Sequence, residues 1–159
     1  ALAMEPKEPG LMKGQFEKPK KWIVDGLMLQ RMFFMAVPMA IGTLYLFNQY
    51  IGADLTKAWS ISLTTLAVFQ WFNAWNCRSE SRSIFQMNPF SNKSLLGATA
   101  VVVLLQFVAL HVGFFQKILN TTELSLNEWL TIIPIASSIV LVEEVRKFFY
   151  RRQLSKISQ

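Results

Sequence analysis

Cysteine and histidine are nearly absent from this chain of 159 residues, which has one of each, Cys77 and His111. A single cysteine excludes a disulfide within the chain, and this pair is too small for a cysteine or histidine metal cluster. His111 is therefore expected to pack near a membrane interface. The sequence also lacks a Gly-rich phosphate loop, a nucleophile–base pair and any polar stretch long enough for a soluble catalytic fold.

Charge is scarce as well. Only 16% of the residues are charged, whereas 52% are hydrophobic, a balance too apolar for an ordinary soluble domain of this size. The net charge of +6 could suit nucleic acid, but the basic residues cluster at the ends of apolar stretches and no nucleic-acid motif is present. The composition predicts an integral, multi-pass membrane protein whose partner is the lipid bilayer and not nucleic acid.

Four apolar stretches predict an all-α bundle of four transmembrane helices in residues 27–150, because a span needs about 20 mostly apolar residues. The apolar part of the last stretch, 129–142, is too short to cross unless its helix continues through the charged residues that follow it. We place a lead-in segment before the bundle at 1–26 and a basic tail after it at 151–159. The predicted spans are 27–47, 59–77, 95–115 and 129–149.

Lysine and arginine are distributed unevenly among the segments between these stretches. Five lie in the N-terminal segment, three between residues 78 and 93, and five from residue 146 onward, whereas 48–57 and 116–127 hold one each. By the positive-inside rule both termini and the middle loop face the cytosol. The first 21 residues hold no long apolar run, so they do not resemble a secretory signal. Because no methionine begins the chain, we expect a fragment of a longer protein.

The first span combines features that affect packing. Pro38 is expected to kink the helix, and Ala36, Ala40 and Gly42 leave room for a neighbouring backbone. Arg31 is expected to extend its side chain to the interface. Trp59 and Trp129 lie where interface anchors are common.

Polar side chains in the second span form one stripe on a helical projection: Ser62, Thr65, Gln70, Asn73 and Asn76. Hydrogen bonds between helices are the favoured interpretation for the two hydroxyls and Asn76. For Gln70 and Asn73 a place on a cation path is equally supported, because neutral oxygens suit hard cations although they lack charge. No carboxylate lies deep in any span, so the main ligands of a transported cation would lie on parts outside this chain.

Acids and bases meet on the last span. Glu143 and Lys147 are four residues apart, and Arg146 and Lys147 follow Glu143 and Glu144 by three, so they are expected to form structural ion pairs on one helical turn. The alternative is a proton relay through the two glutamates.

Three segments resemble the C-terminal membrane region of the type II P-type cation-transporting ATPases, in the calcium-pump-like branch. Residues 1–12 (ALAMEPKEPGLM) are similar to the segment after the sixth membrane helix of these pumps. Residues 72–92 (FNAWNCRSESRSIFQMNPFSN) resemble the end of the eighth helix and its loop, and residues 126–148, with EWL and VEEVRKF, resemble the tenth helix. The resemblance covers nearly the whole chain, in order and at matching spacing.

The resemblance implies that the four spans are helices seven to ten of a pump that uses ATP and Mg²⁺ to transport a cation, with Ca²⁺ expected. The family's DKTGT, TGES and GDGxND motifs are absent, so this chain alone should not hydrolyse ATP. Gln70 matches a position where the sarcoplasmic pumps have a calcium-binding glutamate, and the lost charge weakens the case for a second calcium site. Asn73 matches an Asn or Asp on the same face, and the acids of the last span match a structural acidic pair.

We therefore expect a membrane subdomain that supports, and at Gln70 and Asn73 lines, the ion-binding helices of an ATP-driven pump. Its partners would be the remaining transmembrane helices and cytosolic domains of the parent. Two other functions stay open. One is a small four-span secondary transporter, which the position of the acids near an interface argues against. The other is a membrane scaffold without transport activity.

Overall fold

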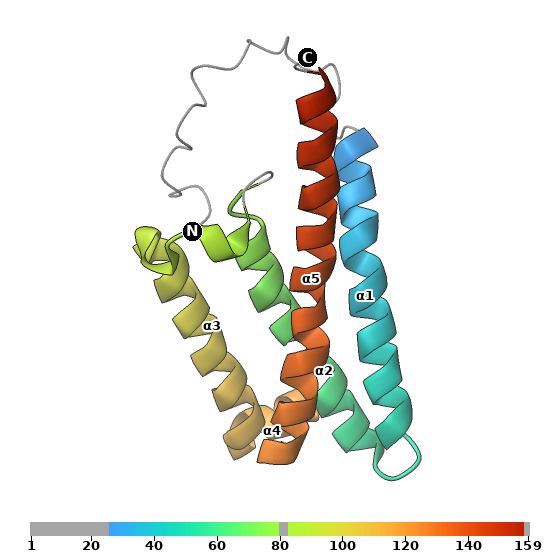
Figure 1. Ribbon diagram of the computed structural model, residues 1–159. Helices are drawn as coiled ribbons and strands as arrows, with labels where there is room; N and C mark the ends of the chain where they lie inside the picture. Colours follow the sequence, from blue (N-terminus) through green and yellow to red (C-terminus); the bar gives the residue numbers. More distant parts are fainter. Residues whose placement is uncertain (1–25, 80–82, 158–159) are drawn as a thin grey trace.

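The protein is all-helical in the part that the structure describes, residues 26–79 and 83–157 of a computed structural model. Most of the predicted lead-in and the resemblance at residues 1–12 lie outside the described residues, as do residues 80–82 of the middle loop. Four long α-helices and one short α-helix account for most of the described chain, and Figure 1 shows their arrangement. In order, the elements are α1 (Gly26–Tyr50), α2 (Leu55–Asn76), η3 (Ile84–Gln86), η4 (Pro89–Ser91), α3 (Lys93–His111), α4 (Gly113–Leu119) and α5 (Leu126–Ile157).

Polar caps fix where two of the long helices begin. The Asp54 carboxylate accepts hydrogen bonds from the backbone N–H groups of Thr56 and Lys57, at 2.9 and 3.3 Å, so α2 begins four residues before the predicted span. At α5 the backbone N–H of Ser125 donates to Glu128 Oε2 at 2.6 Å, which is one half of a capping box. These caps satisfy N–H groups that have no partner within the helix.

The third helix is shorter than predicted. α3 ends at His111 because Val112 adopts an extended backbone, and the separate helix α4 begins at Gly113, whereas the sequence suggested one helix from 95 to 115. Carbonyls near the end of α3 are satisfied from outside: Gln116 Nε2 donates to Leu110 O at 2.5 Å and Thr121 Oγ1 donates to Ala109 O at 2.9 Å. The apolar composition of residues 112–115 concealed this break.

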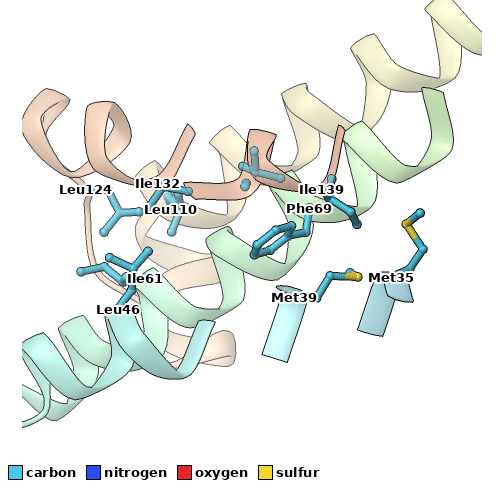
Figure 2. Close-up of a cluster of buried hydrophobic side chains, with 11 residues drawn as sticks. Met35, Met39, Leu46, Ile61, Phe69, Leu110, Leu124, Ile132 and Ile139 are labelled. Carbon is cyan, nitrogen blue, oxygen red and sulfur yellow. The ribbon is translucent and has the colours of Figure 1, made fainter. Parts of the chain in front are cut away.

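The core lies mainly between α1, α2 and α5, and Leu110 of α3 and Leu124 join it, as Figure 2 shows. Phe69 of α2 is fully buried with Ile139 of α5, and Met39 of α1 is 9% exposed. Gly42 permits the close approach of α1, since a Cβ there would lie 2.9 Å from the Phe69 ring. Ala36 and Ala40, which the sequence grouped with Gly42, are exposed.

α3 lies beside α2 and stands apart from α1 (Figure 1). Two side-chain hydrogen bonds join α3 to α2: Gln106 Nε2 donates to Thr64 Oγ1 at 3.0 Å, and Trp75 Nε1 donates to Thr99 Oγ1 at 3.1 Å. Much of the α3 surface is exposed and apolar, including the run 101–105. The arrangement therefore has a packed three-helix core with a fourth long helix along one side.

Two helices are long and apolar enough to cross a membrane, in the ranges Leu29–Tyr50 and Lys93–His111. α2 and α5 fall below that mark among the described residues. Both are long, but α2 carries many hydroxyls and amides, and α5 carries the acids and bases of its second half. The positions of these polar groups therefore matter for what the bundle can do.

Candidate functional site

The predicted polar stripe of α2 divides between the inside and the outside of the bundle. Thr65 and Asn76 are fully buried, Ser62 and Asn73 are half-buried, and Gln70 is exposed. The five polar side chains therefore do not line one common surface. Its inner edge packs against the other helices, and its outer edge reaches the surface at Gln70.

The inner members are bonded in two different ways. The Ser62 and Thr65 hydroxyls donate to carbonyls one turn earlier in α2, Ala58 O at 2.8 Å and Ile61 O at 2.6 Å. The sequence favoured bonds between helices for these hydroxyls, but a hydroxyl on a helix reaches its own preceding turn first. Asn76 does bond between helices, since its Nδ2 donates to Ile139 O of α5 at 3.4 Å.

Gln70 belongs to an open face of α2, which we define by the exposed side chains of that helix: Leu55, Trp59, Leu63, Leu66 and Gln70. These positions fall within about 80° of one another at 3.6 residues per turn. Leu63 and Leu66 are 43% exposed and Trp59 is 54% exposed. An amide thus stands in an otherwise apolar, uncovered strip.

Asn73 lies at the border of the open face. It is half-buried, and its Oδ1 accepts a weak hydrogen bond from the Cys77 thiol at 3.9 Å. The amide oxygens of Gln70 and Asn73 are one helical turn apart in sequence, so both could contribute oxygen ligands to one site beside α2. They bring no negative charge, and no group of three acidic, histidine or cysteine side chains gathers within 26–79 and 83–157.

A buried ion cluster lies at the end of the bundle where α1 begins and α2 ends. Its centre is the fully buried carboxylate of Glu143 in α5. Arg146 donates to both oxygens of Glu143 at 2.8 Å, with the three-residue spacing that the sequence suggested. The second arginine comes from α1: Arg31 Nη2 is 3.3 Å from Glu143 Oε1. Arg31 was expected to reach the interface, and its ion pair with a helix far along the chain had no signal in the sequence.

Lys147 has a different partner from the one predicted. Its Nζ, fully buried, donates to the backbone carbonyl of Asn76 at 3.2 Å, and no ion pair joins it to Glu143 or Glu144 in the described chain. Glu144 turns instead to the loop after α2, where its Oε1 accepts from the backbone N–H of Ile84 at 2.9 Å. The cluster therefore connects α5 with α1, with the end of α2 and with the next loop.

An ion pair at the opposite end of the bundle was missed by sequence reasoning. Lys57 Nζ is 3.0 Å from Glu128 Oε2 and donates to Glu123 O at 2.7 Å. Lys57 and Glu128 each lie in the first turn of a long helix. Opposite charges at these two positions are the sequence signal that could have predicted the ion pair. Nearby on α3, His111 stacks on Phe107 with ring centroids 4.0 Å apart, a packing role. Trp129 stacks on Trp71 at 6.5 Å.

Comparison with known proteins shows which family this chain is similar to. The family described as "Cation transporting ATPase, C-terminus" matches residues 1–149. Calcium-transporting ATPase 1 of Saccharomyces cerevisiae is 30% identical over 156 residues, which is 96% of this chain and 16% of the yeast protein. Calcium-transporting ATPase 4, endoplasmic reticulum-type, of Arabidopsis thaliana is 40% identical over 102 residues, 64% of this chain and 10% of that protein.

A bacterial relative is similar over most of the chain as well. The probable cation-transporting ATPase F of Mycobacterium bovis is 24% identical over 143 residues, 89% of this chain and 16% of that protein. The chain thus spans 10 to 16% of the length of the curated relatives named here.

Proposed function

This chain belongs to the family of cation-transporting ATPase C-terminal regions, and from that premise we propose that it forms four transmembrane helices beside the ion path of an ATP-driven calcium pump. The spans are α1, α2, α3 and α5, and both ends of the chain face the cytosol. ATP hydrolysis with Mg²⁺ belongs to the rest of the pump. Its remaining membrane helices and cytosolic domains are the partners of this chain.

The distribution of charge supports four crossings. Basic side chains lie at the end of the bundle that holds the ion cluster: Arg31, Arg78, Lys93, Arg146, Lys147, Arg151 and Arg152. The opposite end holds Lys57 and Lys117. By the positive-inside rule the cluster end is cytosolic. α2 and α5 carry more polar groups than their neighbours, and the buried ones form hydrogen bonds inside the bundle, as polar residues in a membrane usually do.

The open face of α2 is the observation that carries the proposal. An exposed amide within an apolar strip is costly in lipid unless a neighbouring protein surface satisfies it. Gln70 and Asn73 therefore point to a protein neighbour on this face, and their oxygens suit a calcium ion held mainly by acidic ligands elsewhere. We propose that the neighbour is the set of ion-binding helices of the pump.

The ion cluster supports a frame and not a proton path. Glu143 accepts two hydrogen bonds from Arg146 of its own helix and forms an ion pair with Arg31 of α1, so its carboxylate joins α5 to α1. The small secondary transporter needs a carboxylate that its substrate can reach, whereas Glu143 is fully buried.

The experiment is calcium-dependent ATP hydrolysis by the full-length parent in native membranes, comparing wild type with Gln70→Ala and Gln70→Glu. We expect Gln70→Ala to lower the apparent calcium affinity, and Gln70→Glu to change it in the opposite direction or alter the cooperativity, because a carboxylate binds calcium more strongly than an amide. Gln106→Ala is the matched control, since that amide bonds to Thr64 between α2 and α3. It should reduce the amount of folded protein without moving the calcium dependence.

Two results would reject the proposal. If no cation stimulates ATP hydrolysis by the parent, the pump assignment of the whole protein is wrong and the scaffold function replaces it. If calcium stimulates hydrolysis but neither Gln70 variant shifts the calcium dependence, the open face of α2 is a packing surface only.

A further inference from the structure

We propose that Lys147 is a positioning residue for the ion path: it holds the end of α2 against α5 and thereby sets where Gln70 and Asn73 lie. This inference rests on the proposed function of the open face of α2. Lys147 itself has no place on that face, because it is fully buried on another helix.

Two hydrogen bonds fasten the last residue of α2 to α5. Lys147 Nζ donates to the Asn76 backbone carbonyl at 3.2 Å, and Asn76 Nδ2 donates to Ile139 O at 3.4 Å. One bond uses the main chain of Asn76 and the other its side chain, and their partners on α5 are two turns apart in sequence. Together they fix both the rotation and the height of the α2 end relative to α5.

The ammonium group suits this position for an electrostatic reason. The last carbonyls of a helix have no intrahelical partner and carry the negative end of the helix dipole, so a cation there is favourable. Lysine side chains near membrane ends usually extend to water. Lys147 is fully buried instead, and burying a charge is costly unless its partners compensate. The Asn76 carbonyl accepts its hydrogen bond, and the nearby charges of Glu143 and Glu144 favour the ammonium.

The rest of the ion cluster lies around the same part of α5 as Lys147. Glu143, one turn before it, is bonded by Arg146 of the same helix and Arg31 of α1. Glu144 accepts from the Ile84 N–H at 2.9 Å and so fixes the loop that leaves α2. Residues of α5 thus contact both the last residue of α2 and the loop that follows it.

Geometry carries this constraint to the open face. Gln70 precedes Asn76 by six residues, about 9 Å along a helix that rises 1.5 Å per residue. Asn73 is closer still, within one turn. A helix is stiff over that length, so a rotation of the α2 end would turn both amides together, and a shift of one residue in register would rotate them by about 100°.

The test uses the full-length parent with Lys147→Met and Lys147→Arg, which remove or keep the charge at similar length. Apparent calcium affinity and maximal ATPase rate per folded pump are measured separately. Gln70→Ala is run beside them as the reference, and Lys93→Met is the matched control, because Lys93 is an exposed lysine at the same end of the bundle.

We expect Lys147→Met to lower the apparent calcium affinity by about threefold to tenfold, the size of effect seen for residues that act through others. Lys147→Arg should recover most of the loss, and Lys93→Met should change nothing. If Lys147→Met does not accumulate, Asn76→Ala removes the side-chain bond to Ile139 and should shift the affinity in the same direction.

The failures of the two proposals are distinguishable. If Gln70→Ala shifts the affinity while Lys147→Met or Asn76→Ala lowers only the amount of folded pump or its maximal rate, the positioning role is refuted and the open face retains its function. If Gln70→Ala itself leaves the affinity unchanged, the function of the face is wrong and the positioning role is refuted with it.

Discussion

Replacing Gly42 by alanine should destabilise the bundle, although alanine is the better helix former. Gly42 lies inside α1, where alanine in place of glycine contributes about 1 kcal/mol of helix propensity. A Cβ at this position would lie 2.9 Å from Phe69 Cζ and 3.0 Å from Ile135 Cγ2, whereas carbon atoms pack best at about 3.5 to 4.0 Å. Phe69 is fully buried and has little room to move.

The magnitude follows from opposing terms. Overpacking a core by one methyl group costs about 1 to 3 kcal/mol, which offsets or exceeds the propensity gain of about 1 kcal/mol. Gly97 supplies the matched control, since it lies inside α3 with nothing within 4 Å of a Cβ built there. Gly97→Ala should therefore show the gain alone. The two variants should differ in unfolding free energy by the overpacking cost, about 1 to 3 kcal/mol.

The assay is the thermal midpoint of the folded pump, followed as the fraction of detergent-solubilised, fluorescently tagged parent that stays monodisperse after heating. Gly42→Ala should melt below Gly97→Ala, and Gly42→Val should melt lower again because it adds two more methyl groups. Equal midpoints for Gly42→Ala and Gly97→Ala would show that α1 does not approach Phe69 this closely, and the packing argument would be wrong.

Other predictions concern the ion cluster and the orientation. Glu143→Ala should lower the unfolding free energy by about 3 kcal/mol, because it leaves Arg31 and Arg146 beside each other without their acid. The same heating assay checks this, with the exposed Glu123→Ala as control. Unchanged stability would contradict the role of the ion cluster. Cys77, exposed after the end of α2, should react with a membrane-impermeant maleimide in inside-out vesicles and not in sealed right-side-out ones, tested with Cys77 as the only cysteine. Labelling in the reverse pattern would invert the proposed topology.

The sequence predicted the helical class and the family, and it located the polar residues of α2, because these depend on local composition and spacing. It could not sort the polar residues by burial. Thr65 and Gln70 looked alike on a helical projection, and only the packing of α1 and α5 against α2 separates them. The break at Val112 was missed for a similar reason, since side chains from Gln116 and Thr121 satisfy the freed carbonyls.

Long-range pairs were the least predictable. The three-residue spacing of Glu143 and Arg146 is visible in the sequence, whereas the contact of Glu143 with Arg31 needs two helices to meet. For Lys147 the sequence predicted a local contact, and the structure shows a long-range one. Its spacing from Glu143 predicts a local ion pair, but the negative end of α2 supplied a competing partner that only the fold places beside it.

The pairing of Arg31 with Glu143 also sets an order of events during synthesis. The two residues are 143 − 31 = 112 positions apart, so at about 5 to 20 residues per second the ribosome needs roughly 6 to 22 s to supply the acid after the arginine. During that time α1 and α2 exist without Ile132, Ile139 and the other α5 side chains that complete their core. A chain interrupted shortly before α5 would therefore keep Arg31 without its acid and leave the apolar surfaces of α1 and α2 uncovered. Both are features that membrane quality control recognises in an incomplete protein.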